Sequence, residues 1–309
     1  SQLTENIHTR LSSIERFNLL SDTWATAQAG LTPLTAYLDL LTLFQEETDH
    51  NVWAAILGPC HYLYRLLSPT QRPALQRRIR DLLGPLTQQL GWSPKDGENA
   101  LISQLRGELL GALGTLGDDR ATQEEAHNVY AHYKADRDTV DRNLIPSLVS
   151  ILAYTGRANV YEEFRQTSQT AKTPQEEQRY QFALAAFRHQ DLLKQTLVMT
   201  LNGDVRTQNA PYLMRSLLMN TDGRELAWAF LQEHWEEMTE KFPDNSVIRM
   251  CEGIVALVTP ELEAEVTDFF AAHPVPQGGK MMDQHLEKLR VAVACQKREA
   301  ANLETYFPG

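Results

Sequence analysis

Histidines and carboxylates are the side chains of this sequence that could do metal chemistry. A catalytic zinc site needs three ligands at one place and a position open to water. The chain has nine histidines and none is followed by a glutamate, so the helical zinc motif H-E-x-x-H is absent. His127 and His132 are five residues apart, which places them on different faces of a helix, so we predict that both are surface residues. His61 lies among aromatic residues, and there we predict a packed, hydrogen-bonded side chain.

Carboxylates could instead transfer protons. Three groups of closely spaced acidic residues offer this chemistry, namely Glu176 with Glu177, Glu236 with Glu237, and the run 261–265. Adjacent carboxylates on an exposed helix are usually only solvated. The nucleophile motif G-x-S-x-G and the nucleotide motifs of the P-loop and G-x-G-x-x-G do not occur in the sequence. We therefore predict no catalytic residue and no metal ligand in this chain.

Two further clusters have chemical potential, one basic and one aromatic. The basic cluster consists of four arginines on one expected helix: Arg72, Arg77, Arg78 and Arg80. We interpret it as a solvated helix face, with docking against an acidic neighbour as the alternative. The aromatic cluster has the spacing of one helix face: Trp228, Leu231, Trp235 and Met238. We interpret it as core packing between helices and not as a ligand cage.

Helix signals cover nearly the whole chain. The segment 173–176, TPQE, has a threonine cap, a proline at the first helical position and the glutamate of a capping box. Thr122 with Glu125 repeats the box, and Thr32-Pro33 predicts another helix start. Gly58-Pro59 falls inside an apolar periodic stretch, which predicts a kink or a break in that helix.

The connections between these segments are short. Asp96-Gly97, Asn202-Gly203 and Asp222-Gly223 could close β-hairpins, but their flanks repeat every three or four residues, so we interpret them as helix–helix connections. The sequence thus predicts an all-α chain of about fifteen helices. Consecutive helices become antiparallel neighbours, and stacked pairs form a curved α-solenoid of the HEAT or armadillo kind. No linker divides the chain, so we predict one helical domain over residues 1–309, with 271–279 as its most exposed loop.

Charge and cysteine content narrow the function classes. A formal net charge of −11 argues against binding to nucleic acid or to anionic membranes. The three cysteines, Cys60, Cys251 and Cys295, are far apart, which favours buried thiols in a reducing compartment and a cytoplasmic location. No charged-then-apolar leader opens the chain, and no apolar run approaches the ~18 residues of a membrane span.

Short motifs occur in a colinear order from residue 14 onward. They are the amphipathic stretch 14–30, Glu47 with Val52-Trp53, Leu90-Gly91-Trp92 with Gly97-Glu98 and Leu105-Arg106-Gly107, Gln175-Glu176-Glu177 with Arg179, the segment 223–235, Phe269-Phe270 with His273-Pro274, and Lys297-Arg298-Glu299. Their order and spacing resemble the C-terminal helical domain of the gluzincin zinc aminopeptidases, the family of aminopeptidase N, puromycin-sensitive aminopeptidase and the endoplasmic-reticulum aminopeptidases. The family's R-x-Q-D/E loop is similar to Arg206-Thr207-Gln208-Asn209, with Asn209 in place of the acid. His234 is a second departure, because it stands in place of asparagine.

The resemblance implies that catalysis and the covering of the active site belong to different domains. In that family a thermolysin-like domain upstream of this region holds the zinc and removes single N-terminal residues from peptides. The helical C-terminal domain forms a bowl that covers the active site and contacts the distal part of the peptide. The implied partners are therefore the chain's own upstream catalytic domain and peptide substrates, and the implied zinc belongs to that catalytic domain. No catalytic or metal role is carried over to a residue of this chain.

A surface that closes over a peptide would need cations for the peptide's C-terminal carboxylate. Arginine binds carboxylates in a bidentate, charge-assisted manner. Arg106, Arg206 and Arg224 are our candidates, because each lies in a segment that carries the resemblance. The alternative is an ion pair or a carbonyl contact between neighbouring helices, above all for Arg106, which lies in the middle of its expected helix.

A hypothesis of another class stays open beside the peptidase domain. The chain could be a free-standing α-solenoid scaffold that binds protein partners, since composition and periodicity fit both. The motif order favours the peptidase domain. An H-E-x-x-H helix upstream in the same gene would decide for it, and a gene that begins near Ser1 would decide for the scaffold.

Overall fold

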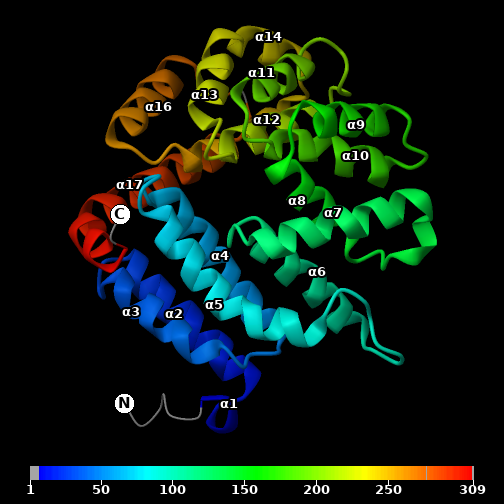
Figure 1. Ribbon diagram of the computed structural model, residues 1–309. Helices are drawn as coiled ribbons and strands as arrows, with labels where there is room; N and C mark the ends of the chain where they lie inside the picture. Colours follow the sequence, from blue (N-terminus) through cyan, green and yellow to red (C-terminus); the bar gives the residue numbers. More distant parts are fainter. Residues whose placement is uncertain (1–6, 276, 308–309) are drawn as a thin grey trace. The chain divides into compact units, whose positions relative to one another are not determined.

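The computed structural model describes residues 7–275 and 277–307. In these ranges it contains seventeen α-helices, four short 3-10 helices and no strand (Figure 1). The predicted all-α, solenoid-like fold class is confirmed, and the predicted curvature stays a prediction. The chain forms two compact units, of which unit 1 comprises Ser1–Ile151 and Cys295–Gly309 and unit 2 comprises Leu152–Ala294. The single domain over 1–309 also stays a prediction.

Unit 1 is built mainly from the first half of the chain. Its helices are α1 (Ile7–Arg10), α2 (Ser13–Gln28), α3 (Leu34–Leu41), α4 (His50–Leu66), α5 (Arg72–Leu90), α6 (Ala100–Gly114), α7 (Arg120–Ala135), most of α8 (Ile145–Thr155) and the end of α17 (Gly279–Tyr306), with 3-10 turns at Thr42–Phe44 and Arg137–Thr139.

Unit 2 is built from shorter helices. They are α9 (Ala158–Gln169), α10 (Pro174–Ala183), α11 (Gln190–Met199), α12 (Ala210–Met219), α13 (Arg224–Glu233), α14 (Trp235–Lys241), α15 (Asp244–Cys251), α16 (Pro260–Ala272) and the start of α17, with 3-10 turns at Leu184–Ala186 and Glu252–Ala256. The predicted loop 271–279 largely coincides with the connection between α16 and α17, although residue 276 lies outside the described residues.

The Asp-Gly and Asn-Gly dipeptides are helix connections, as predicted. Asp96-Gly97 lies between α5 and α6, Asn202-Gly203 between α11 and α12, and Asp222-Gly223 between α12 and α13. Gly97 and Gly203 have φ of +74° and +93°, which glycine adopts without a side-chain penalty. These dipeptides therefore reverse the chain between helices and do not pair strands.

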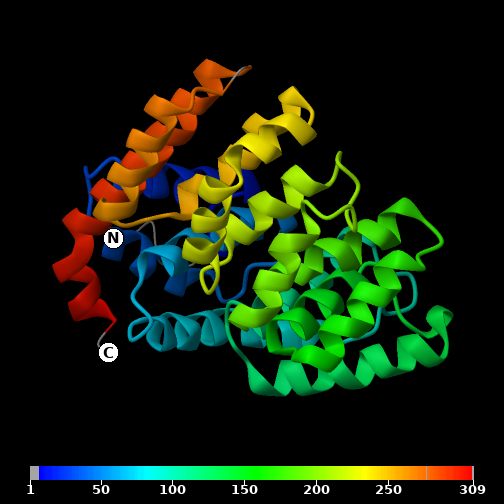
Figure 2. The ribbon, with the colours of Figure 1, turned by 90° about the horizontal axis from the view of Figure 1, so that it is seen from above.

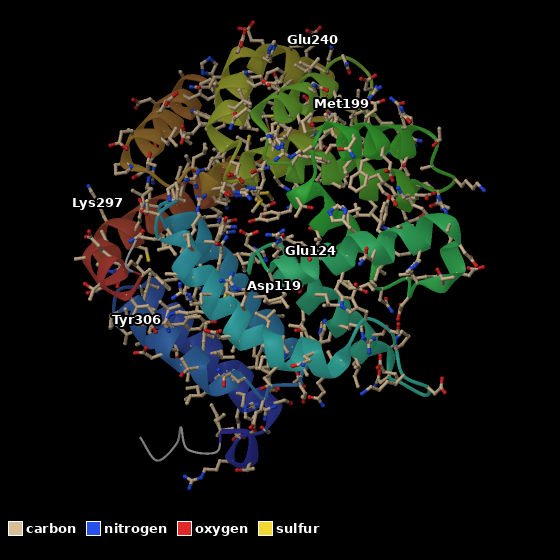
Figure 3. All side chains as sticks on the ribbon, viewed as in Figure 1. Asp119, Glu124, Met199, Glu240, Lys297 and Tyr306 are labelled. Carbon is tan, nitrogen blue, oxygen red and sulfur yellow. The ribbon has the colours of Figure 1, made fainter. Side chains whose placement is uncertain are left out.

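The predicted start of one helix, α10, is confirmed, whereas the starts of α7 and α3 differ from the prediction. Thr173 caps α10 as predicted, since its Oγ1 accepts the Glu176 N–H at 3.2 Å. Helix α7 begins earlier than predicted, because Asp119 is the cap and accepts the Thr122 N–H at 2.8 Å (Figure 3). Pro33 is the cap residue of α3 and not its first helical residue.

Gly58-Pro59 predicted a kink or a break, and a break is wrong, because α4 runs unbroken from His50 to Leu66, while a kink stays a prediction. A proline inside a helix removes the hydrogen bond to the carbonyl four residues earlier, here that of Ala55. That carbonyl has another donor, since the Tyr37 hydroxyl donates to it at 2.8 Å. A side chain of α3 thus replaces the bond that Pro59 cannot make.

The aromatic stripe of α13 and α14 lies in the core of unit 2, as predicted. Trp228, Leu231, Trp235 and Met238 are all buried. Trp228 meets Phe269 edge to face, with ring centroids 5.3 Å apart, and Trp235 meets Phe270 at 5.5 Å. Edge-to-face packing of this kind adds to the stabilisation that burial provides.

The last helix contributes to unit 1 as well as to unit 2. Helix α17 is continuous over 28 residues (Figure 2). Near its end, Arg298 donates to the carbonyl of Ala27 at 3.0 Å, and Glu299 accepts the N–H of Leu34 at 3.1 Å. These contacts cap the end of α2 and the start of α3. At Gly30, φ is +77° and an added Cβ would lie 2.9 Å from the Arg298 Cζ, so another residue would be strained and would displace the Arg298 side chain.

Candidate functional site

Arg106 lies on α6 and is 2% exposed. Its Nη2 donates to Glu98 Oε2 at 2.5 Å, and its Nε donates to the Leu90 carbonyl at 3.3 Å. The Arg106 guanidinium is the main reason that the pKa of Glu98 lies below its usual value. Arg106 thus joins α6 to the end of α5 and to the α5–α6 loop. These are the ion pair and the carbonyl contact that we gave above as the alternative to peptide binding.

Arg224 begins α13, and it also contacts backbone. Its Nη1 donates to the Ala256 carbonyl at 2.6 Å. Ala256 ends the 3-10 turn Glu252–Ala256, so the contact joins the start of α13 to the end of that turn. It is a carbonyl contact of the kind that we gave above as the alternative to peptide binding.

Arg206 differs from the other two candidates because its side chain is 61% exposed. Its Nη2 donates to Glu177 Oε2 at 2.8 Å, and Glu177 is 17% exposed. An arginine has five N–H donors in a planar fork. Arg206 therefore presents a solvent-accessible guanidinium beside one carboxylate, on the connection that precedes α12.

A fourth arginine, Arg16, forms a buried ion pair that we did not predict. Its Nε and Nη2 donate to the two carboxylate oxygens of Glu47 at 2.6 and 3.0 Å, and Glu47 is fully buried. Burial alone would raise the pKa of Glu47, but hydrogen bonds from Arg16 and from the N–H groups of Thr48 and Asp49 outweigh it and lower the pKa. Both residues lie in motifs singled out above, yet only tertiary structure pairs them.

The titratable residues considered from the sequence do not form a reactive cluster. Within the described ranges, no three His, Cys, Asp or Glu residues are arranged to hold a metal ion. His127 and His132 are exposed, as predicted. His61 is exposed as well, although desolvation by the surrounding protein lowers its pKa to about 4, so it is not the fully packed residue that we predicted. Glu176 is buried and not solvated, since its carboxylate accepts the Lys172 N–H at the start of α10.

The basic cluster on α5 is only partly a solvated face. Arg72 lies over the ring of Tyr64 and Arg78 over the ring of Tyr306, with distances to the centroids of 4.7 and 4.1 Å. Arg80 donates to the Gly117 carbonyl at 2.5 Å. Three of the four arginines therefore make specific contacts, which hydropathy alone does not reveal.

A groove of about 710 Å³ lies on unit 1 between the α5–α6 loop and α7 with its following turn. Trp92 and His132 line it, together with the carboxylates Glu125, Asp136, Asp138 and Asp141. Arg142 also lines the groove, so its carboxylates outnumber its arginine and its net charge fits a cationic group. None of the described helices has the length and apolar character needed to cross a membrane.

The amino-acid sequence is similar to those of known proteins. The family model described as "ERAP1-like C-terminal domain" matches residues 1–291. "Aminopeptidase M1-B" of Oryza sativa subsp. japonica is 28% identical over an alignment of 298 positions that covers 92% of this chain and 33% of that protein. "Aminopeptidase M1" of Arabidopsis thaliana is 28% identical over 296 residues, with shares of 91% and 33%. "Glutamyl aminopeptidase" of Bos taurus is 23% identical over an alignment of 314 positions, which covers 97% of this chain and 32% of that protein. The chain spans about a third of the length of these curated relatives.

Proposed function

The chain belongs to the ERAP1-like C-terminal domain family, and on that premise we propose that it is the non-catalytic C-terminal domain of a zinc aminopeptidase. The match over residues 1–291, with relatives named aminopeptidases that are about three times as long, carries this proposal. In it, the zinc and its ligands belong to a catalytic domain outside these 309 residues. That domain removes N-terminal residues from peptides, in the cytoplasm.

The helical domain has a physical role in this scheme. It covers the active-site chamber, acts as one domain with the catalytic part as its partner, and contacts the distal part of the peptide. A covered chamber excludes folded proteins and keeps bulk water from the reacting groups. Buried side-chain contacts such as Arg16 with Glu47 support the role, because a cover must keep its shape while substrates enter and leave.

Arg206 is the arginine that we propose for the peptide's C-terminal carboxylate. Its exposed guanidinium can add a carboxylate without losing Glu177, because the two acceptors take different N–H groups. Arg106 and Arg224 remain proposed peptide contacts of lower rank. Ligand binding there competes with the contacts to Glu98 and to the Ala256 carbonyl.

The proposed function is tested on the full-length gene product. We expect about one zinc per chain and hydrolysis of aminoacyl anilides, with neither property in the isolated 309-residue chain. A full-length product without zinc and without peptidase activity would overturn the proposal and leave the scaffold hypothesis.

The peptide contact is tested by Arg206→Ala in the same enzyme. Loss of a charge-assisted hydrogen bond should lower kcat/KM for long peptides by roughly tenfold and leave a dipeptide-sized substrate unchanged. Lys194→Ala is the matched control, because Lys194 is 59% exposed in unit 2 and also pairs with a carboxylate, that of Asp191. Equal losses on both substrates, or no loss on either, would refute the role of Arg206.

A further inference from the structure

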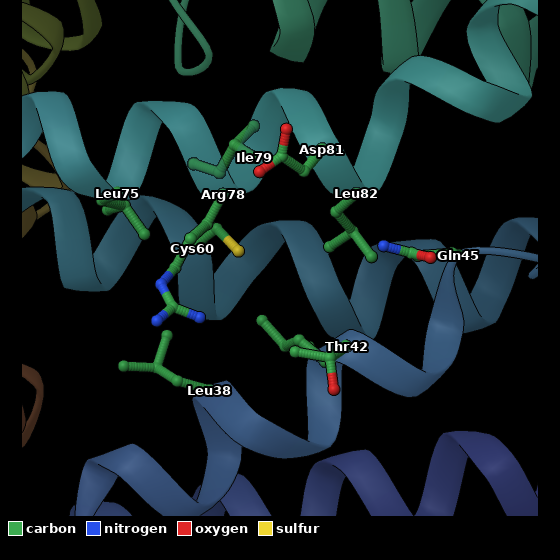
Figure 4. A pocket seen from close by; sticks show the side chains of 10 residues that line it. Leu38, Thr42, Gln45, Cys60, Leu75, Arg78, Ile79, Asp81 and Leu82 are labelled. Atoms are coloured by element: carbon green, nitrogen blue, oxygen red, sulfur yellow. The ribbon is translucent and has the colours of Figure 1, made fainter. Parts of the chain in front are cut away.

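A small pocket lies among α3, α4 and α5 of unit 1, and its volume is about 150 Å³ (Figure 4). The interior is apolar and buried, formed by Leu38, Leu41, Cys60, Leu75, Ile79 and Leu82. The mouth is polar and exposed, formed by Thr42, Gln45, Arg78 and Asp81. The pocket therefore separates an apolar space from a charged rim.

The volume limits the ligand. An apolar cavity of about 150 Å³ holds roughly one benzene molecule, whereas sites for drug-sized ligands begin at about 300 Å³. One branched or aromatic side chain fits this space, and a peptide segment does not. Burial raises the pKa of the Cys60 thiol to about 12, so Cys60 is a neutral part of the wall and not a nucleophile.

The rim carries one charge of each sign. Arg78 and Asp81 are three residues apart on α5, and within the described residues neither forms a salt bridge. The Arg78 guanidinium is held over the Tyr306 ring at 4.1 Å, and the Tyr306 hydroxyl donates to Asp39 at 2.6 Å. In Figure 4 the guanidinium lies beside Cys60 and Leu38, while Asp81 lies further along α5. The cation is thus positioned by an aromatic ring and is not neutralised by a salt bridge.

We propose that this pocket binds a free apolar α-amino acid such as leucine. The side chain occupies the apolar interior, the α-carboxylate binds Arg78, and the α-ammonium group pairs with Asp81. A zwitterion satisfies both rim charges at once. A fatty acid would pair with Arg78 but leave Asp81 without a counter-charge, and an alkylamine would pair with Asp81 but leave Arg78 without one.

Binding at this pocket does not depend on the proposed function, but its consequence rests on it. An aminopeptidase releases free amino acids, so an amino-acid site on its C-terminal domain would sense product. The following experiment measures binding by the 309-residue chain and needs no peptidase activity. Its failure is therefore distinguishable from a failure of the proposed function.

The test is a calorimetric titration of the chain with L-leucine and three truncated probes. The probe 4-methylpentanoate lacks the amine, 3-methylbutylamine lacks the carboxylate, and glycine lacks the side chain. We expect saturable leucine binding at millimolar concentration or below, and affinities for each probe weaker by about tenfold or more. Affinity for 4-methylpentanoate equal to that for leucine would overturn the amino-acid assignment.

Two variants test whether Arg78 binds the carboxylate of leucine and Asp81 its ammonium group. Arg78→Gln should bring the affinity for leucine down to that for 3-methylbutylamine, and Asp81→Asn should bring it down to that for 4-methylpentanoate. Both residues are exposed, so circular dichroism should show an unchanged fold. Arg77→Gln is the matched control, because Arg77 is exposed on the same helix and does not line the pocket. Absence of saturable leucine binding, or leucine binding that neither rim variant weakens, would overturn the proposal.

Discussion

Unit 1 and unit 2 are stabilised in different ways. Unit 1 buries charge: Glu47 and Arg106 are at most 2% exposed, and each pairs with an opposite charge. Unit 2 buries rings, those of Trp228, Trp235 and Phe270, which pack with the half-buried ring of Phe269. Its described ion pairs, such as Arg215 with Glu252 and Arg206 with Glu177, reach the surface.

This difference indicates in which unit stability depends on individual contacts. A buried ion pair stabilises only while both partners are present, because a lone buried charge is costly. An aromatic cluster shares its stabilisation among many contacts without strict directions. We therefore expect unit 1 to be sensitive to single polar substitutions and unit 2 to tolerate them.

The largest expected effect is that of Arg16→Met. It leaves the Glu47 carboxylate buried without its cation and should lower the free energy of unfolding by about 3–5 kcal/mol. Urea unfolding measures this loss. Thiol labelling locates it, because Cys60 of unit 1 should then react at lower urea concentration than Cys251 of unit 2.

Arg120→Met is the control for that loss. Arg120 is 89% exposed and pairs with Glu124, so the change should cost less than about 1 kcal/mol. Equal costs for the two variants would remove the contrast between buried and surface charge.

A smaller effect separates two buried tryptophans. Trp53 in unit 1 donates its Nε1–H to the Glu47 carbonyl at 2.9 Å, whereas Trp228 in unit 2 has no partner for its Nε1–H among the described residues. Trp228→Phe should cost less than about 1.5 kcal/mol, because the lost volume is offset by removal of an unpaired donor. Trp53→Phe should cost about 1–3 kcal/mol more, because it leaves a buried carbonyl unpaired.

Thermal unfolding of these two variants under one buffer condition is the measurement. A larger loss for Trp228→Phe than for Trp53→Phe would contradict the view that unit 2 depends less on hydrogen bonds.

The smallest effect concerns pH. His285 of α17 is 5% exposed. Burial lowers its pKa below 6.5, helped by Lys288 and Arg249 and opposed by Glu252 and the Ile248 backbone. The unfolded chain then binds more protons below pH 6.5, so stability should fall as pH falls through that range.

His285→Leu should remove this loss. Melting temperatures at about pH 5.5 and about pH 7.5 should differ less in the variant than in the parent chain. Glu47 acts in another window: its pKa is lowered from 4.5, so its contribution is present above about pH 4.5 and is lost below it. An unchanged pH dependence in His285→Leu would show that other groups dominate between these windows.

The helical class, the cap at Thr173 and the buried stripe at Trp228 could be predicted from the sequence, because each depends on residues close together in the chain. The continuity of α4 could not, because Tyr37 supplies the missing donor from another helix. The start of α7 was misplaced because two possible caps, Asp119 and Thr122, are only three residues apart.

The candidate site was harder to predict for the same reason. Sequence motifs singled out Arg106 and Arg224, but the carbonyls that they contact, those of Leu90 and Ala256, are defined only by tertiary structure. The pocket at Arg78 and Asp81 has no local signature, since three helices form it. An arginine in a family motif is expected to make a specific contact, but the packing of the other helices determines which group it contacts.

Helix α17 has a consequence for biosynthesis. A ribosome makes residues 152–294 before it makes Arg298 and Glu299, which cap α2 and α3. Unit 2 is therefore complete in sequence once residue 294 has been made, while unit 1, although started first, cannot complete its packing before Arg298 and Glu299 are made. A premature stop codon shortly after position 294 would thus damage the half of the protein that was synthesised earliest.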